Sequence, residues 1–397
     1  MTDTNQGRDE TAGLPFAPEE YARRMSLARA EMDRCGLDAL LITVPQNYYY
    51  LTGFELGASH SLIFLILPCQ GDGAWVTRKT EQSNVRAFAP LISAKRGFGV
   101  DDSSDYIDVL AGALREMGLD HARIGIEESS LCFTIAQYRR LQQVCPHAKL
   151  SDITGMIERF RSVKSPAELA YMREAGEISA KAIHACFGAL REGVTDSELA
   201  AVLVATAIRE GSGRMGMQPF VAAGPRTFRA HASWSGTPIG RGEVINVELA
   251  SQVRHYHVPT FRVFVVGAPS DEIRRMHDAS EAGMRAGMER IKPGMTSHDA
   301  DRVVREAIEK TGYGENFVVR AAYGIGVALA PGWGETPDVM AIRPDDQRVL
   351  APGMCFHLVP ALYKEGVGCV CASMPIEVTD LGVSKLTSIE PKLFIRA

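Results

Sequence analysis

The sequence lacks the features that mark several classes of protein. No apolar run reaches the roughly 18–20 residues that a membrane span requires, and the longest, Ser61–Cys69, has the length of a strand. None of the eight cysteines stands in a C-x-x-C zinc pair, and a net charge of −5 gives no basis for binding nucleic acid. The sequence therefore predicts a cytoplasmic protein with reduced thiols, no membrane segment and no nucleic-acid partner.

Motifs for two common chemistries are missing as well. The glycines of the YGIG segment, Gly324 and Gly326, match neither the dinucleotide-binding fingerprint nor the P-loop, whose backbone N–H groups hold phosphates. No G-x-S-x-G turn is present, so a serine nucleophile on a strand-to-helix turn has no support. Neither a nucleotide cofactor nor a serine triad is expected.

A chain of 397 residues is long enough for two domains. Residues 1–13 are polar and acidic, which predicts a disordered leader rather than a secretory signal. Residues 14–160 alternate helical and strand patterns, as expected for an α/β domain. Helices are expected from Pro18 to Gly36, at Tyr106–Met117 and at Ile135–Val144, and an aromatic turn at residues 46–54.

Residues 161–397 combine long amphipathic helices with strands. Ser165 and Pro166 make a strong helix start, as N-cap and first helical residue. Further helices are expected at Thr195–Gly211, Glu272–Ile291 and Ser297–Thr311. The pattern predicts an α+β domain with helices on one side of a curved, largely antiparallel sheet, whose concave face can hold a pocket.

Five segments in order resemble the creatinase/prolidase/aminopeptidase family: NYYYLTG, KSPAELAYMREAG, the strand pair that begins GEVINVELA, YGIG, and LAPGMCFHLVPALY. The resemblance runs over residues 14–394. It implies an α+β C-terminal pita-bread catalytic domain preceded by an N-terminal α/β creatinase-like domain. It also implies a homodimer, since members of the family are commonly dimeric.

Within this family the chain is most similar to the ectoine hydrolase branch, which works without metal. The matching segments are LPFAPEEYARRM, AHASW, HYHVP, AYGIGVALAPGWGE and RPDDQRVLAPGMCFHLVPALY. By this resemblance the substrate is a small polar metabolite that is not a peptide.

The positions of the peptidase metal ligands are filled by other residues. The resemblance puts Glu248 in place of the first aspartate, Pro259 of the second, Tyr323 of a histidine and Val359 of a glutamate. Two divalent cations about 3–4 Å apart need several bridging oxygens to offset their repulsion. The sequence therefore predicts a site without metal or cofactor and argues against aminopeptidase activity.

The last strand departs even from the ectoine hydrolase branch. Where that branch resembles G-L-E-I-T-E-S, this chain has GCVCASMP, which puts Cys371 and Met374 near the two glutamate positions. Cys369 and Cys371, two residues apart, are expected to share one face of this strand, and no carboxylate follows until Glu377. This departure leaves the identity of the substrate open.

Glu248 is the main catalytic candidate. It lies in the apolar strand VINVELA, where a carboxylate is costly unless it is paired, hydrogen-bonded or neutralised. A raised pKa would suit it as a general base, and in ionised form it could be a nucleophile; the resemblance implies an attacking glutamate here. The alternative is a structural acid paired with Arg262, or an outward-facing residue.

Histidines are the next candidates. His231, on an expected loop, is predicted to be a proton shuttle, because imidazole titrates near neutral pH and the family carries a substrate-facing histidine there. A surface histidine is the alternative. Alternation on a strand would put His255 and His257 on one face and Tyr256 on the other. The two histidines could bind a transition metal, but no third ligand is evident.

The remaining candidates are expected to bind substrate. Aromatic faces attract a flat cation such as an amidinium by roughly 0.5–2 kcal/mol per contact, although simple packing is the alternative. Cys371 would be a nucleophile only if a cation or histidine lowered its pKa, with His357 as its base; an inert buried thiol is the alternative. The predicted substrate-binding set is Trp234, Tyr256, His257, Tyr323, Trp333, His357 and Cys371.

These residues together predict a metal-independent hydrolase of a C–N bond, in a cyclic amidine or an amide, of a small polar metabolite. Glu248 is its nucleophile or base and His231 its proton shuttle. Two alternatives stay open: a non-hydrolytic tailoring enzyme (isomerase, cyclase or lyase) on the same scaffold, and a catalytically inactive binding protein. The joint presence of Glu248, His231 and the aromatic residues argues against the second.

Overall fold

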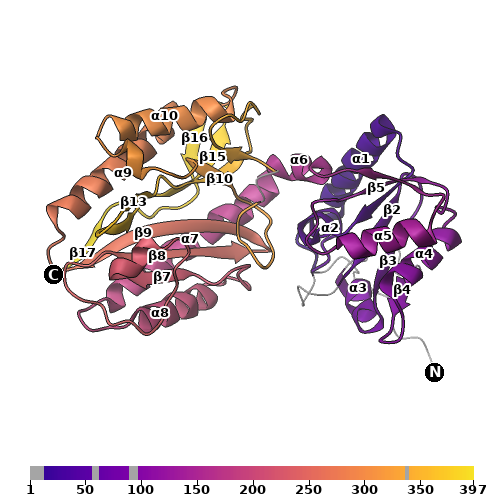
Figure 1. Cartoon of the computed structure of the whole chain (residues 1–397), viewed down its shortest axis with the longest axis horizontal. Coiled ribbons are helices and arrows are strands. Elements are labelled where there is room, and N and C mark those ends of the chain that lie inside the picture. Colours follow the sequence, from indigo (N-terminus) through magenta and orange to yellow (C-terminus); the bar gives the residue numbers. More distant parts are fainter. Residues whose placement is uncertain (1–12, 56–61, 89–96, 336–338) are drawn as a thin grey trace. The chain divides into compact units, whose positions relative to one another are not determined.

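The computed structural model describes residues 13–55, 62–88, 97–335 and 339–397. The leader predicted for residues 1–13 lies, except for Gly13, outside the described residues. The chain separates into two compact units, Met1–Phe160 and Arg161–Ala397 (Figure 1). In the part of the chain that the structure describes, no helix is long and apolar enough to cross a membrane.

The first unit is built on a mixed six-stranded sheet of order β4-β3-β2-β1-β5-β6, in which β1 is antiparallel to β2 and parallel to β5. Helices α4 and α5 pack on it through a buried cluster that joins Leu110 and Leu141 to Phe64 and Ile124. The elements are α1 (Pro18–Cys35), β1 (Ala39–Ile42), α2 (Pro45–Thr52), β2 (Phe64–Pro68), β3 (Ala74–Arg78), η1 (Lys79–Glu81), α3 (Gln82–Phe88), β4 (Gly97–Val100), α4 (Tyr106–Glu116), β5 (Arg123–Ile126), α5 (Ile135–Val144), β6 (Lys149–Asp152) and α6 (Met156–Ser162), which ends at the start of the second unit.

The aromatic segment expected to form a turn is instead helix α2. Pro45 stands in its first turn, where a missing N–H costs nothing, and Gly53 ends it in the left-handed region with a φ of 77°. Tyr48, Tyr49 and Tyr50 are all buried. The prediction was wrong because three consecutive buried rings give no helical period in the sequence.

Among the described residues, the second unit has two larger sheets, each covered by a pair of helices, and the two-stranded sheet β13-β14 (Figure 1). Helices α7 and α8 pack on the four-stranded sheet of order β17-β9-β8-β7, and α9 and α10 on the five-stranded sheet of order β11-β10-β12-β15-β16. The elements are α7 (Pro166–Ala189), α8 (Asp196–Arg209), β7 (Phe220–Ala223), η3 (Gly224–Phe228), β8 (Ile245–Val253), β9 (Tyr256–Val266), α9 (Asp271–Arg290), α10 (Ser297–Glu309), η4 (Gly314–Asn316), β10 (Ala322–Gly324), β11 (Ala341–Ile342), β12 (Cys355–Leu358), β13 (Leu362–Lys364), β14 (Gly368–Val370), β15 (Met374–Thr379), β16 (Gly382–Lys385) and β17 (Phe394–Arg396).

The strand expected to carry both Cys369 and Cys371 is interrupted. Strand β14 ends at Val370 and β15 begins at Met374, so Cys371 lies in the connection between the hairpin β13–β14 and the five-stranded sheet. In this connection Ala372 N–H donates to the side chain of Ser280 in α9 at 2.8 Å rather than to a neighbouring strand. The single strand predicted for the two cysteines is therefore wrong, although both thiols lie in one buried cluster near Glu248.

Pairing between β7, β8 and β9 fixes the direction of the central carboxyl group. Glu248 in β8 lies opposite Phe220 on one side and Phe261 on the other. Its neighbours Val247 and Leu249 point to the other face, into the cluster under α7 and α8. Glu248 and the two phenylalanines therefore point away from these helices.

Candidate active site

Glu248 is a nearly buried carboxyl group, with 12% of its side chain exposed. Its Oε1 lies 3.8 Å from Nδ1 of His357 in β12, and the Tyr323 hydroxyl of β10 is the polar neighbour that acts to lower the pKa of the carboxyl group. The same hydroxyl lies 2.9 Å from Nδ1 of His357. The four-stranded sheet thus supplies the acid, and the five-stranded sheet supplies its polar partners.

Aromatic rings surround this group. Trp333 Nε1 donates to the Tyr323 hydroxyl at 3.1 Å, and the Trp333 ring packs against Phe220 with centroids 5.0 Å apart. Because Phe220 lies opposite Glu248 in the sheet, Trp333 joins the cluster from its own loop. The structure therefore brings together the predicted residues Glu248, Tyr323, Trp333 and His357.

Burial dominates the electrostatics of these groups. It raises the pKa of Glu248 to about 8, against which the hydrogen bond from Tyr323 acts in the opposite direction. Burial, together with the charge of Arg262, lowers the pKa of His357 to about 3. Burial also raises the pKa of the Tyr323 hydroxyl far above its usual value. His357 is thus neutral at physiological pH, and its contact with Glu248 is not an ion pair.

The alternative reading of Glu248 as the partner of Arg262 is not supported. Arg262 lies opposite Val247 in the β8–β9 register, so its side chain points to the face of the sheet opposite to that of Glu248. Its guanidinium donates to four backbone carbonyl groups, those of Phe261, Ser373, Ile389 and Glu390.

His231 lies at the edge of the cluster. It is exposed and stands in a turn with a φ of 59°, a left-handed conformation that is uncommon outside glycine. Its ring packs against Phe220 with centroids 5.2 Å apart. One phenylalanine ring therefore contacts both His231 and Trp333, and it lies beside Glu248.

Two of the predicted substrate-binding residues have other neighbours. The Tyr256 hydroxyl donates to Glu168 of helix α7 at 2.7 Å, on the face away from Glu248. Trp234 packs against the cluster under α7 and α8, and it lines a cavity of about 770 Å³ together with Ala200 and Val204 of α8. Neither contact involves Glu248.

His257 points to the same face as Glu248, but backbone groups use both of its ring nitrogens. Nδ1 lies 2.8 Å from the carbonyl oxygen of His255, and Nε2 accepts the Gly216 N–H at 2.9 Å. Burial lowers its pKa to about 3. His255 has a φ of 64° in the turn before β9, so the expectation that the two histidines share a strand face is wrong. His257 holds the loop around Gly216 in place.

Cys371 is buried near Glu248 and Arg262. Burial raises the pKa of its thiol far above the usual value, and Arg262 offsets this only in part. A thiol that stays protonated is a poor nucleophile. The geometry therefore favours a packing or lining role for Cys371.

Two members of the cluster escaped sequence reasoning. Ser373 Oγ lies 2.8 Å from Nε2 of His357 and accepts the Phe261 N–H at 3.0 Å. Phe220 joins His231 to Trp333. Phe220 carried no signal beyond its aromatic ring, whereas a serine between two apolar stretches, GCVCA and MPI, was a sign of a buried hydrogen bond.

Two known protein families match this chain. Residues 170–380 match the model of metallopeptidase family M24, and residues 24–163 match the creatinase/prolidase N-terminal domain. The chain belongs to metallopeptidase family M24. The predicted family is thus confirmed, as is the fold: an N-terminal creatinase domain followed by a pita-bread domain.

Relatives of this M24 chain have different activities in their names. It is 28% identical to the ectoine hydrolase of Halomonas elongata over 398 residues, 96% of this chain and 99% of that protein. It is 25% identical to the Xaa-Pro dipeptidase of Pyrococcus furiosus over 366 residues, 91% and 97% of the two chains. The prolidase structure from Thermococcus sibiricus superposes with a TM-score of 0.84 at 24% identity, covering 94% of this chain and 99% of that one, a likeness of fold. M24 membership makes this chain a member of a hydrolase family.

A divalent metal centre, which the family name implies, does not fit the residues around Glu248. Pro259 has no side-chain donor, Phe261 is apolar, and the ring nitrogens of His357 are engaged by Tyr323 and Ser373. Among the described residues, Glu248 belongs to no group of three metal-capable side chains. A single carboxylate cannot hold two mutually repelling cations.

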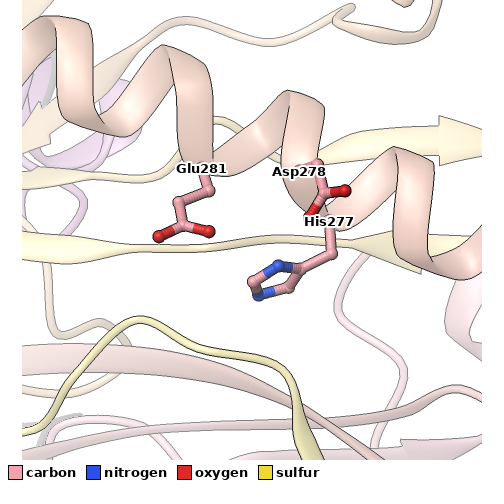
Figure 2. A group of neighbouring side chains, drawn as sticks. All are labelled: His277, Asp278 and Glu281. Carbon is pink, nitrogen blue, oxygen red and sulfur yellow. The ribbon is translucent and has the colours of Figure 1, made fainter.

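The group of three metal-capable side chains in the described part of the chain lies on helix α9. Donor atoms of His277, Asp278 and Glu281 come within 4.8 Å of one another (Figure 2). Oε1 of Glu281 already binds Arg285 at 2.6 Å. This group does not include Glu248, and it plays no part in the candidate active site.

Proposed function

We propose that this M24 protein hydrolyses a C–N bond, in a cyclic amidine or an amide, of a small polar metabolite without a metal ion. Glu248 is the nucleophile or general base, and His231 is the proton shuttle. The observation that carries the proposal is the nearly buried Glu248 carboxyl group, held among Tyr323, His357 and aromatic rings that do not make up a metal site.

The pKa of Glu248 favours a cationic substrate. With a pKa of about 8, this carboxyl group is mostly protonated at pH 7 in the free protein. A cation within about 4–6 Å of a carboxyl group favours its ionised form. An amidinium bound against Glu248 would therefore generate the carboxylate that the reaction needs, while Trp333 and Tyr323 offer faces for cation–π contact.

In the general-base form of the reaction, Glu248 accepts a proton from a water molecule whose oxygen bonds to the amidine carbon. The C–N bond then breaks, and His231 protonates the leaving nitrogen. In the nucleophilic form, a Glu248 oxygen bonds to the carbon first, and the C–N bond breaks as His231 protonates the leaving nitrogen. Water then cleaves the resulting acyl imidate (from an amidine) or anhydride (from an amide) and releases Glu248. Both forms consume one water molecule for each bond cleaved.

Ectoine is the first substrate to test, because the match to the relative named ectoine hydrolase covers 99% of that protein. The experiment follows ectoine by NMR with the wild-type protein and with Glu248→Gln, Glu248→Ala and His231→Ala. The proposal predicts a product heavier by one water molecule, and loss of turnover in each Glu248 variant. A fully active Glu248→Gln protein would sink the mechanism.

Glu243→Gln is the matched control. Glu243 lies just before β8 and accepts the Gly240 N–H at 2.9 Å, away from the Tyr323 cluster. Its replacement should leave turnover unchanged. Melting temperatures of all variants near that of wild type would separate lost chemistry from lost fold.

A non-hydrolytic tailoring enzyme is the second candidate. It is favoured by the connection at Cys371 and the buried Met374, where the ectoine hydrolase branch carries glutamates. Turnover in H₂¹⁸O distinguishes the two, since a hydrolase places one ¹⁸O in the product and an isomerase places none. Cytoplasmic location and homodimerisation stay predictions; analytical ultracentrifugation tests the second.

A further inference from the structure

We propose that Ser373 is a positioning residue for the reaction at Glu248. Its hydroxyl holds the His357 imidazole in the Nδ1–H form, so that the single hydrogen of the Tyr323 hydroxyl is directed at the Glu248 carboxylate. The inference rests on the proposed function of Glu248 and assigns a role to a side chain that does not itself reach the substrate.

Hydrogen counting at Tyr323 sets the problem. A phenol hydroxyl has one hydrogen and two lone pairs, and here it has three polar neighbours. Trp333 Nε1, 3.1 Å away, can only donate, so it takes one lone pair. If Nδ1 of His357 carried no hydrogen, it would take the Tyr323 hydrogen at 2.9 Å. The Tyr323 hydrogen is therefore available to Glu248 only when Nδ1 of His357 is protonated and donates to the second lone pair of the Tyr323 oxygen.

Ser373 decides which ring nitrogen is protonated. Its oxygen accepts the Phe261 N–H at 3.0 Å, and its hydrogen can go to Nε2 of His357 at 2.8 Å or to the Phe261 carbonyl at 3.3 Å. That carbonyl already accepts from Arg262 at 2.6 Å. The shorter contact and the unfilled acceptor both favour donation to Nε2, which leaves the one hydrogen of the neutral ring on Nδ1.

The surroundings keep the imidazole neutral. His357 is fully buried, and Arg262 donates to the carbonyl groups of both Phe261 and Ser373. A second proton on the ring would face this cation, which is why the ring carries a single hydrogen. The chain of hydrogen bonds ends on backbone groups, so it orients the reacting carboxyl group and does not lead protons to solvent.

Other titratable groups act on Glu248 or on its partners, and they must be the same in the variants whose pH profiles are compared. Tyr363 in β13, Cys369 in β14 and Cys371 beyond it interact with Glu248 and stay neutral, since burial raises their pKa values. Arg320 lies over the Tyr323 ring, 5.4 Å from its centroid. A substitution at Ser373 leaves each of these groups in place.

The test compares Ser373→Ala with Ser179→Ala. Ser179 is an equally buried serine that also bridges two backbone groups, accepting from Ser251 N–H at 3.1 Å and donating to the Val258 carbonyl at 3.0 Å. Its loss calibrates the structural cost of removing such a hydroxyl. Ser373→Thr, which keeps a hydroxyl, is the rescue variant.

The first readout is the ¹⁵N NMR tautomer of His357 in the free protein, which requires no substrate. Wild type and Ser179→Ala should show the Nδ1–H form, and Ser373→Ala a mixture. The second readout is the pH profile of turnover. A hydrogen bond to a charged group is worth on the order of one pKa unit, so the acid limb of Ser373→Ala should move up by about one unit. Its turnover should fall about tenfold at pH 7 and recover near pH 9.

An Nε2–H tautomer in wild type would overturn the inference even if Ser373→Ala failed to fold. So would a Ser373→Ala protein with an unchanged tautomer and an unchanged pH profile. A uniform loss of turnover at all pH values would show a merely structural role. If Glu248→Gln is active, the proposed function fails whatever the tautomer; if it is inactive and the tautomer is wrong, only the role of Ser373 fails.

Discussion

The Tyr323 hydroxyl lies 2.9 Å from Nδ1 of His357 and interacts with Glu248, so one phenol joins the five-stranded and four-stranded sheets of the pita-bread domain. By the family resemblance, this tyrosine stands where the peptidases carry a histidine ligand. A neutral phenol cannot hold a divalent cation there, but it can donate to a carboxylate. On that resemblance, we expect Tyr323 to supply a hydrogen-bond donor to the proposed nucleophile or base in place of a metal ligand.

Glu248 should make the protein less stable at alkaline pH. Its pKa is raised from 4.5 to about 8, so between these values the unfolded chain releases the proton that the folded protein retains. The stability contribution is present below pH 4.5 and is lost as pH rises to about 8. Glu248→Gln should therefore raise the free energy of unfolding by roughly 2–4 kcal/mol at pH 9 and by little near pH 5.

Urea unfolding of wild type, Glu248→Gln and Glu243→Gln at pH 5, 7 and 9 checks this. The Glu243 variant should differ from wild type by the same amount at every pH. A Glu248→Gln protein no more stable than wild type at pH 9 would mean that this carboxyl group ionises freely in the folded protein.

Cys371 should resist alkylation at neutral pH. Its thiol is buried and its pKa is far above the usual value, whereas Cys35 is exposed. Iodoacetamide should therefore label Cys35 and leave Cys371 unmodified in the native protein. Peptide mass spectrometry, with Cys35→Ser as the control, measures the labelling. Selective labelling of Cys371 together with loss of activity would support the alternative that Cys371 is a thiolate nucleophile.

Gly216→Ala should destabilise the loop that His257 holds. A Cβ atom at Gly216 would lie 2.0 Å from the carbonyl oxygen of Gly332, next to Trp333. Because the Gly332 carbonyl belongs to the backbone and cannot rotate away, the loop must move, at a cost of roughly 1–3 kcal/mol. The hydrogen bond from Gly216 N–H to His257 would be lost with it.

Gly112→Ala is the matched control for this prediction. Gly112 lies inside helix α4 with open space around a new Cβ, so alanine should stabilise the helix by roughly 0.5–1 kcal/mol. Thermal melting of the two variants should move in opposite directions. Equal melting temperatures would show that the Gly216 loop adapts without strain.

Local signals predicted much of the fold. Ser165 caps α7 with a capping box and Pro166 opens the helix, and Gly36 ends α1 with a φ of 65°. Such features depend only on neighbours in the chain. The interruption at Cys371 was not predictable, because it depends on a hydrogen bond to Ser280 of a distant helix.

The candidate site was likewise predictable where local sequence determines it, and not where distant contacts do. Glu248 stood out as an acid in an apolar strand, and Tyr323, Trp333 and His357 lie with it. Whether a side chain joins Glu248 depends on its face of the sheet and on the register between strands. These placed Tyr256 against helix α7, although no residue near it in the sequence says so.

The central claim is that the Glu248 site works without a metal ion. Elemental analysis of the purified, catalytically active protein tests it most directly, with Glu248→Gln measured in parallel. The account predicts well below one transition-metal ion per chain in both proteins. About one or two ions per chain in wild type, lost in Glu248→Gln, would contradict it.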